Sequence, residues 1–175
     1  MANREALREL QTRLAARLQA ARAEGLSVSS WLAVEAAGHR FLLPLGQSGE
    51  IFSWPGVQAV PYTQPWFLGV ANLRGALTGV IDLAGLLGEA APRSEQAFAE
   101  ASLLALNAAL GVNAALLVDR LAGLRGTDAF VSSEPPEEGA PPFFGTNYLD
   151  AQGVRWQELN LQALSQHPAF LSISA

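Results

Sequence analysis

The stretch FLLPLGQSGEIFSWPGVQAVPYTQPWFLGVANLRGALTGVIDLAGLLG, residues 41–88, carries most of the information about the fold. Short apolar runs alternate in it with closely spaced glycines and prolines, a pattern typical of β-strands joined by tight turns. The run Leu77–Leu83 has two β-branched residues at its centre and is predicted to be a strand. We expect one helical turn after it, over Leu83–Leu87, ended by Gly88. The chain is therefore predicted to be all-β.

Before this stretch the sequence predicts a helix and a hairpin. Arg4 to Glu24 is rich in Ala, Leu, Arg and Glu, and it precedes Gly25, a residue common at helix ends. Its apolar residues recur at three- and four-residue intervals: Leu7, Leu10, Leu14, Leu18 and Ala21. We expect residues 1–26 to form a helix that packs on its own domain; docking on a partner, or half of a coiled coil, is the alternative. Two apolar runs around Ala37-Gly38-His39 predict a hairpin.

After this stretch, residues 89–100 form a polar connector, which predicts a boundary between subdomains of about 27–88 and 89–175. The segment Ser102–Val118 is ambiguous, because its Ala and Leu favour a helix while its Asn and Gly residues suit the turn of a strand pair. The Pro- and Glu-rich segment Ser132–Pro142 is expected to be an exposed loop. Near the C-terminus we expect a strand over 154–159 and then a helix over 161–164, capped by Asn160 and stopped by Pro168. An apolar tail follows this helix.

The composition excludes several classes of protein. The chain has no cysteine and no lysine, so it has no disulfide, thiolate-zinc site or Walker-type phosphate loop. The net charge is −5 with no basic stripe, which argues against nucleic acid as a partner. The charged N-terminus is unlike a signal peptide, and asparagines interrupt the uncharged residues 101–118, so no membrane insertion is expected. We therefore expect a cytoplasmic protein without a cofactor or a metal.

Catalytic constellations are also missing from the sequence. Asp82 and Asp119 end the similar segments VIDL and LVDR, and a carboxylate pair can in principle do acid–base work in a small hydrolase. Neither has a histidine partner in sequence, so we interpret both as structural residues that accept hydrogen bonds from turn amides. His39 and His167 are expected on the surface.

An ordered set of motifs links residues 41–88 to a known family. They are Glu50-Ile51, Val60-Pro61, the run GVANLRG at Gly69–Gly75, VIDL at Val80–Leu83 and Leu87-Gly88. Together they resemble the CheW-like chemotaxis coupling proteins. The segment 101–124 resembles the family's second hairpin, and the tail LNLQALSQHPAFL resembles that of the PilI-type members from type IV pilus systems. The resemblance covers about residues 29–171 and leaves the N-terminal helix unexplained.

The resemblance implies a fold and a function. The fold would be two packed SH3-like five-stranded β-barrels, with Ser102–Val118 as a β-hairpin and with added N-terminal and short C-terminal helices. The function would be that of a non-enzymatic scaffold, which couples the cytoplasmic tip of a membrane chemoreceptor to a CheA-type histidine kinase in a receptor array. Control of pilus-driven twitching is the leading expectation and flagellar chemotaxis the alternative.

The resemblance also implies a partner-binding surface, in which Arg74 and Glu50 hold together. An ordinary surface ion pair, worth about 0–1 kcal/mol, is the alternative interpretation of these two residues. The residues carried over from the family motifs are Glu50, Ile51, Gly69, Asn72, Arg74 and Gly75.

Overall fold

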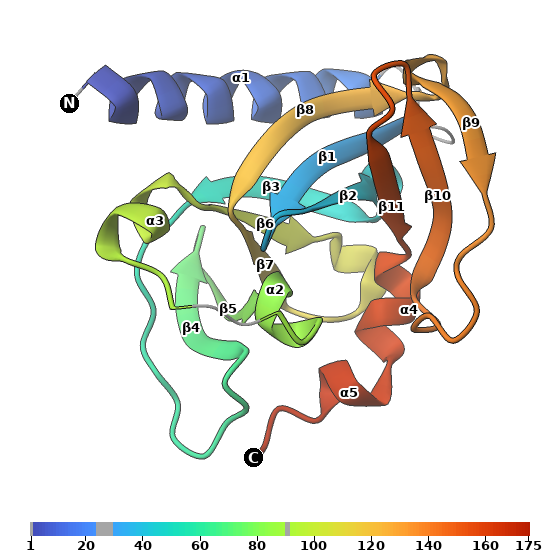
Figure 1. Cartoon of the computed structure of the whole chain (residues 1–175). Coiled ribbons are helices and arrows are strands. Elements are labelled where there is room, and N and C mark those ends of the chain that lie inside the picture. The colour runs from blue at the N-terminus through green and yellow to red at the C-terminus, as the bar shows by residue number, and fades with distance from the viewer. Residues whose placement is uncertain (1, 24–29, 90–91) are drawn as a thin grey trace.

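The computed structural model describes residues 2–23, 30–89 and 92–175, and β-strands predominate in it (Figure 1). Six strands form the first sheet, in the order β8 (Arg120–Gly126), β1 (Ser30–Ala36), β2 (His39–Pro44), β11 (Arg155–Leu159), β10 (Phe144–Asp150) and β9 (Phe130–Glu134). Five strands form the second, in the order β3 (Ser48–Ser53), β6 (Ser102–Leu106), β7 (Ala114–Val118), β5 (Ala76–Asp82) and β4 (Phe67–Leu73). The predicted all-β class with two packed β units is confirmed, although the first sheet has six strands rather than five.

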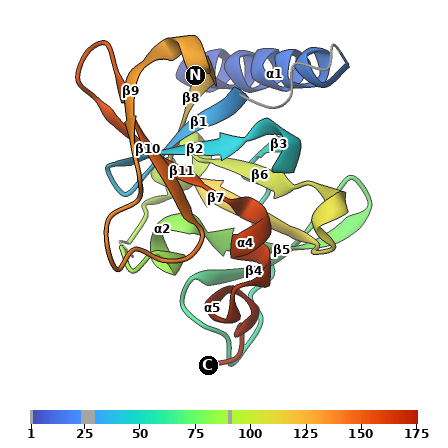
Figure 2. The same cartoon turned by 90° about the vertical axis from the view of Figure 1, so that its right-hand side faces the viewer.

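Helices lie at the two ends of the molecule and between the strands (Figure 2). They are α1 (Ala2–Ala23), α2 (Leu83–Leu86), α3 (Glu95–Glu100), α4 (Leu161–Gln166) and α5 (Pro168–Leu171), with single 3-10 turns η1 (Leu45–Gln47), η2 (Ala108–Leu110) and η3 (Thr127–Ala129). The expected N-terminal helix, helical turn after β5 and helix capped by Asn160 are all present. No helix among the described residues is both long and apolar enough to span a membrane.

Three layers of apolar side chains explain why the strands form where they do. The largest layer lies between the sheets, and each sheet has a smaller one on its other face. In β1, Leu32 and Val34 face the central layer, whereas Trp31 and Ala33 face the outer one. The β6 and β7 strands are likewise buried on both faces, so they read as continuous apolar runs without alternation. This double burial settles the ambiguous segment 102–118 as a strand pair.

The two sheets exchange strands across the boundary expected near residue 88. Strands β1 and β2 precede it, yet they lie in the sheet that contains β8 to β11. Strands β6 and β7 follow it, yet they lie beside β3 and β5. Each sheet therefore draws on both parts of the chain.

The structure adds detail to three local expectations. The polar connector 89–100 contains α3, whose first turn is capped by Ser94 accepting a hydrogen bond from the Ala97 amide at 3.1 Å. The start of the proline-rich segment belongs to β9, where pairing with β10 overrides its polar composition. Pro168 ends α4 but also begins α5, since its missing N–H costs nothing in a first helical turn.

Helix α1 packs on its own domain, as the favoured interpretation predicted. It contacts β3, β8, α3 and η1. Of its predicted apolar stripe, Leu14 is buried and Leu10 is 40% exposed, while the side chains of Leu18 and Ala21 lie outside the described residues, as does Gly25.

Candidate functional site

The β4–β5 hairpin presents Arg74 at its tip. Leu73 pairs with Ala76, so Arg74 and Gly75 form a two-residue turn with φ of 50° and 81°. Positive φ at both positions is the type I′ geometry that suits the twist of paired strands. The Asn72 side-chain oxygen accepts a hydrogen bond from the Gly75 amide at 2.8 Å and closes the turn. The Arg74 side chain is consequently 74% exposed on a fixed backbone.

Arg74 contacts Glu50, as predicted from the sequence. The distance from Arg74 Nη1 to Glu50 Oε1 is 3.0 Å, and the Glu50 side chain is 34% exposed. Strands β3 and β4 are the two edges of the five-stranded sheet, so this ion pair joins elements from opposite edges. The pair leaves several guanidinium donors of Arg74 facing solvent, which a carboxylate or carbonyl of another protein can accept.

Two of the residues carried over from the family face inward instead. Gly69 has φ of 142°, and a Cβ there would lie 2.3 Å from the Gln58 carbonyl oxygen. The close approach allows Gln58 and Val70 to exchange two backbone hydrogen bonds of 2.9 Å. The chain that approaches Gly69 is therefore the protein's own. Ile51 is half-buried and packs against the central layer.

The apolar tail fastens the long β3–β4 loop. The Gln64 amide donates to the Ile173 carbonyl at 2.7 Å, and the Ala175 amide donates to the Tyr62 carbonyl at 3.0 Å. Tyr62 itself has φ of 60° and is 89% exposed. The tail thus holds an exposed aromatic residue on a fixed backbone.

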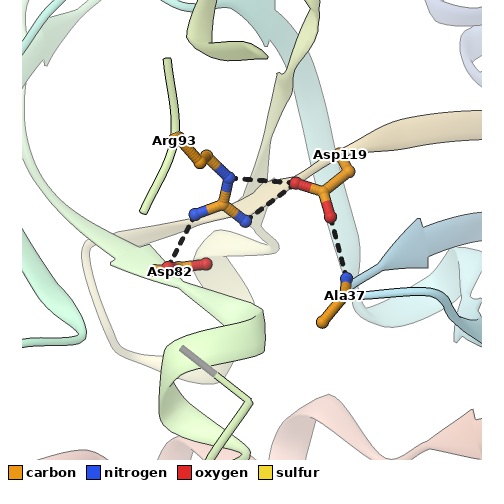
Figure 3. A network of polar contacts seen from close by, with 4 residues as sticks. All are labelled: Ala37, Asp82, Arg93 and Asp119. Carbon is orange, nitrogen blue, oxygen red and sulfur yellow. Dashed lines mark hydrogen bonds and ion pairs between the residues drawn. The ribbon is translucent and has the colours of Figure 1, made fainter. Parts of the chain in front are cut away.

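An ion cluster joins the two sheets, with Arg93 at its centre (Figure 3); Arg93 and Asp82 are buried, whereas the Asp119 side chain is partly exposed. Arg93 Nη1 lies 2.6 Å from Asp82 Oδ2, and Nη2 lies 2.8 Å from Asp119 Oδ1. Asp119 Oδ2 in turn accepts a hydrogen bond from the Ala37 amide, in the β1–β2 turn, at 2.8 Å. Burial alone lowers the pKa of Arg93, but its hydrogen bonds and the charges of the two carboxylates outweigh burial, so that its pKa is raised.

The cluster corrects the expectation for the two aspartates. Asp119 does accept a turn amide, as predicted, whereas the Asp82 side chain binds Arg93 and its Oδ1 has no partner among the described residues. Sequence reasoning missed Arg93, although a signal was present. It is the one basic residue between Arg74 and Arg120, and two carboxylates end buried strands nearby in the fold.

The histidines have no shared site. His39 is exposed and lies 3.8 Å from Glu89, while His167 Nδ1 accepts the Ala169 amide at 3.1 Å and caps α5. In the part of the chain that the structure describes, no group of three or more His, Asp or Glu residues is placed to hold a metal ion.

Comparison with known proteins decides the family. The family model described as the CheW-like domain matches residues 30–169. This chain belongs to the CheW-like family. The chain is 33% identical over 154 residues to Protein PilI of Pseudomonas aeruginosa, and this match covers 85% of the chain and 83% of PilI. Its fold resembles the crystal structure of the scaffolding protein TtCheW from Thermoanaerobacter tengcongensis, with a TM-score of 0.65 and 18% identity over 81% of this chain and 94% of that one.

Proposed function

We propose that this CheW-like protein couples the cytoplasmic tip of a membrane chemoreceptor to a CheA-type histidine kinase, within a chemosensory array that controls pilus-driven twitching. The exposed Arg74–Glu50 pair is the observation that carries the proposal for the interface. The similarity to PilI supports the pilus pathway. In this proposal the protein works in the cytoplasm and reaches the membrane only by binding the receptor.

A scaffold acts by presenting rigid surfaces, and this hairpin is rigid. The type I′ turn and the Asn72 hydrogen bond fix the backbone at Arg74 before a partner arrives, and the ion pair with Glu50 favours one position of its side chain. Such preorganisation reduces the entropy lost on binding. The planar guanidinium can then form two parallel hydrogen bonds with one carboxylate of the receptor or kinase. No step of this function requires catalysis.

The hydrolase alternative has no support in the geometry. Arg93 engages both Asp82 and Asp119. The Asp82 side chain is only 9% exposed, and the Asp119 side chain, 38% exposed, has its second oxygen occupied by the Ala37 amide. A carboxylate that is buried and paired in this way stabilises the contact between the sheets and is not open to a substrate.

Binding of the Arg74→Ala variant to purified receptor signalling domain and kinase tests the proposal. We expect at least tenfold weaker binding, about 1.4 kcal/mol. Arg120→Ala is the matched control, because Arg120 is 77% exposed and lies 3.7 Å from a less exposed glutamate, Glu35. Unchanged binding by Arg74→Ala, or an equal loss in both variants, would refute the interface. A pull-down from the protein's own cells then separates pilus from flagellar partners.

A further inference from the structure

Helix α1 lies across both sheets. It contacts β3, an edge strand of the five-stranded sheet, and β8, an edge strand of the six-stranded sheet (Figure 1). It also contacts α3 and η1. A 22-residue helix thus occupies a surface formed by elements from the whole domain, although the family match begins only at residue 30. We call the surface under this helix, formed by β3, β8, α3 and Ser102, the α1 seat.

Few side chains hold α1 on this seat. Between residues 4 and 17, only Gln11 and Leu14 are buried, with exposed fractions of 7% and 3%. The Gln11 amide donates a hydrogen bond of 2.7 Å to the Ser102 hydroxyl, which is also buried. Leu10, on the predicted apolar stripe, remains 40% exposed. Segments with few buried contacts are those that open locally before the rest of a protein unfolds.

The seat is only partly filled near the start of α1. A groove of about 390 Å³ remains there between α1 and α3, with Trp54 and Phe98 among its walls. These two rings stack with their centroids 4.6 Å apart. Arg4 and Arg8 of the helix line one side of the groove, and Glu95 of α3 lines the other. The present occupant is therefore a helix whose basic residues line the same groove as one acidic residue, Glu95, and the two stacked aromatic rings.

We propose that the α1 seat is a helix-binding groove which α1 occupies within its own chain, and that an amphipathic, basic helix of a partner protein takes its place. The chemistry of the seat defines this partner helix. It presents an amide donor toward Ser102, an apolar residue three positions later, and arginine or lysine toward Glu95.

A peptide of residues 2–23 with a fluorescent label is the probe. Its affinity is measured for the wild-type chain and for the Gln11→Ala/Leu14→Ala variant, in which the intramolecular helix is loosened while the seat is intact. Alanine preserves helix propensity, so the helix itself is not broken. We expect the variant to bind the peptide at least tenfold more tightly than the wild type does. A peptide carrying the same two substitutions should not bind.

The matched control is Leu10→Ala/Gln12→Ala, which changes the same two residue types at exposed positions of α1. It should bind the peptide as the wild type does. Equal binding by wild type and loosened variant, or none by the variant, overturns the proposal. So does a concentration-dependent dimer of the variant on size exclusion, which would identify the occupant as α1 of a second copy. None of these outcomes depends on receptor or kinase binding.

Hydrogen exchange on the unmodified chain gives an independent test if the variant does not fold. Amides of α1 should exchange at least tenfold faster than those of β6, the strand that contains Ser102. Exchange as slow as that of β6 would show that α1 does not leave its seat, and the proposal would be wrong.

Discussion

Replacement of Arg93 by alanine should destabilise the protein strongly. Arg93 is 10% exposed and holds Asp82, which is 9% exposed and has one carboxylate oxygen already without a partner. Removing the guanidinium leaves this carboxylate buried and unpaired, which typically costs about 3–5 kcal/mol. In a domain of this size that loss lowers Tm by roughly 10 °C. The four tryptophans provide the signal for urea and thermal unfolding.

Arg155→Ala is the matched control for this experiment. Arg155 also binds two carboxylates, at 2.8 and 3.1 Å, but all three side chains are at least half exposed. Its removal should change Tm by no more than a few degrees, because solvent screens exposed pairs. Arg93→Ala is also introduced into a variant that carries Asp82→Asn. There it should lower the free energy of unfolding much less, because the buried partner of Arg93 is then neutral. If Arg93→Ala and Arg155→Ala lower Tm equally, the buried cluster does not stabilise the contact between the sheets.

Three further predictions concern Arg74, Gly69 and Asp150. Arg74→Ala should leave Tm within a few degrees, because an exposed ion pair contributes about 1 kcal/mol or less. In a binding titration, Arg74→Lys should restore only part of the affinity for the partner that Arg74→Ala loses. A large fall in the Tm of Arg74→Ala would show instead that Arg74 stabilises the fold. Gly69→Ala should lower the free energy of urea unfolding by about 2 kcal/mol more than Gly111→Ala, whose Cβ would meet open space. Asp150 accepts the Gln152 and Val154 amides, and the Val154 hydrogen bond is the main cause of its lowered pKa. Its contribution to stability is present above about pH 4 and is lost as the pH falls, so Asp150→Asn should flatten the acid limb of stability measured from pH 7 to pH 2.

The sequence predicted the fold class because turn residues are local signals. Gly38 and Gly75 lie at hairpin turns with positive φ, and Asn160 caps α4 through the Ala163 amide. Motif order also identified Glu50 and Arg74 as a contact before the structure placed them 3.0 Å apart. That success came from the family resemblance, since no physical rule on spacing connects two residues at opposite edges of a sheet.

The remainder depended on contacts between distant residues. Gln11 lies on a polar position of a charged helix, and only the fold shows Ser102 beneath it, 91 residues later. Arg93 lies in a segment that reads as a surface connector, because local composition contains no information about which side of a loop faces the core. The inward orientation of Gly69 could not be predicted from the sequence either, since Gln58, which approaches it, belongs to a loop whose sequence has no pattern typical of a paired strand.

The exchange of strands between the sheets has a consequence for biosynthesis. Phe41 of β2 pairs in parallel with Gln157 of β11, and Leu32 of β1 pairs with Leu124 of β8. A ribosome that has made only the first half of the chain has therefore released two very apolar strands that can pair with each other, but whose outer neighbours, β8 and β11, do not yet exist. Domains usually fold from the N-terminus during synthesis, but this one must wait for residues near its end. Its nascent chain should therefore depend on chaperones, and fragments divided near residue 90 should fold only when both are present together.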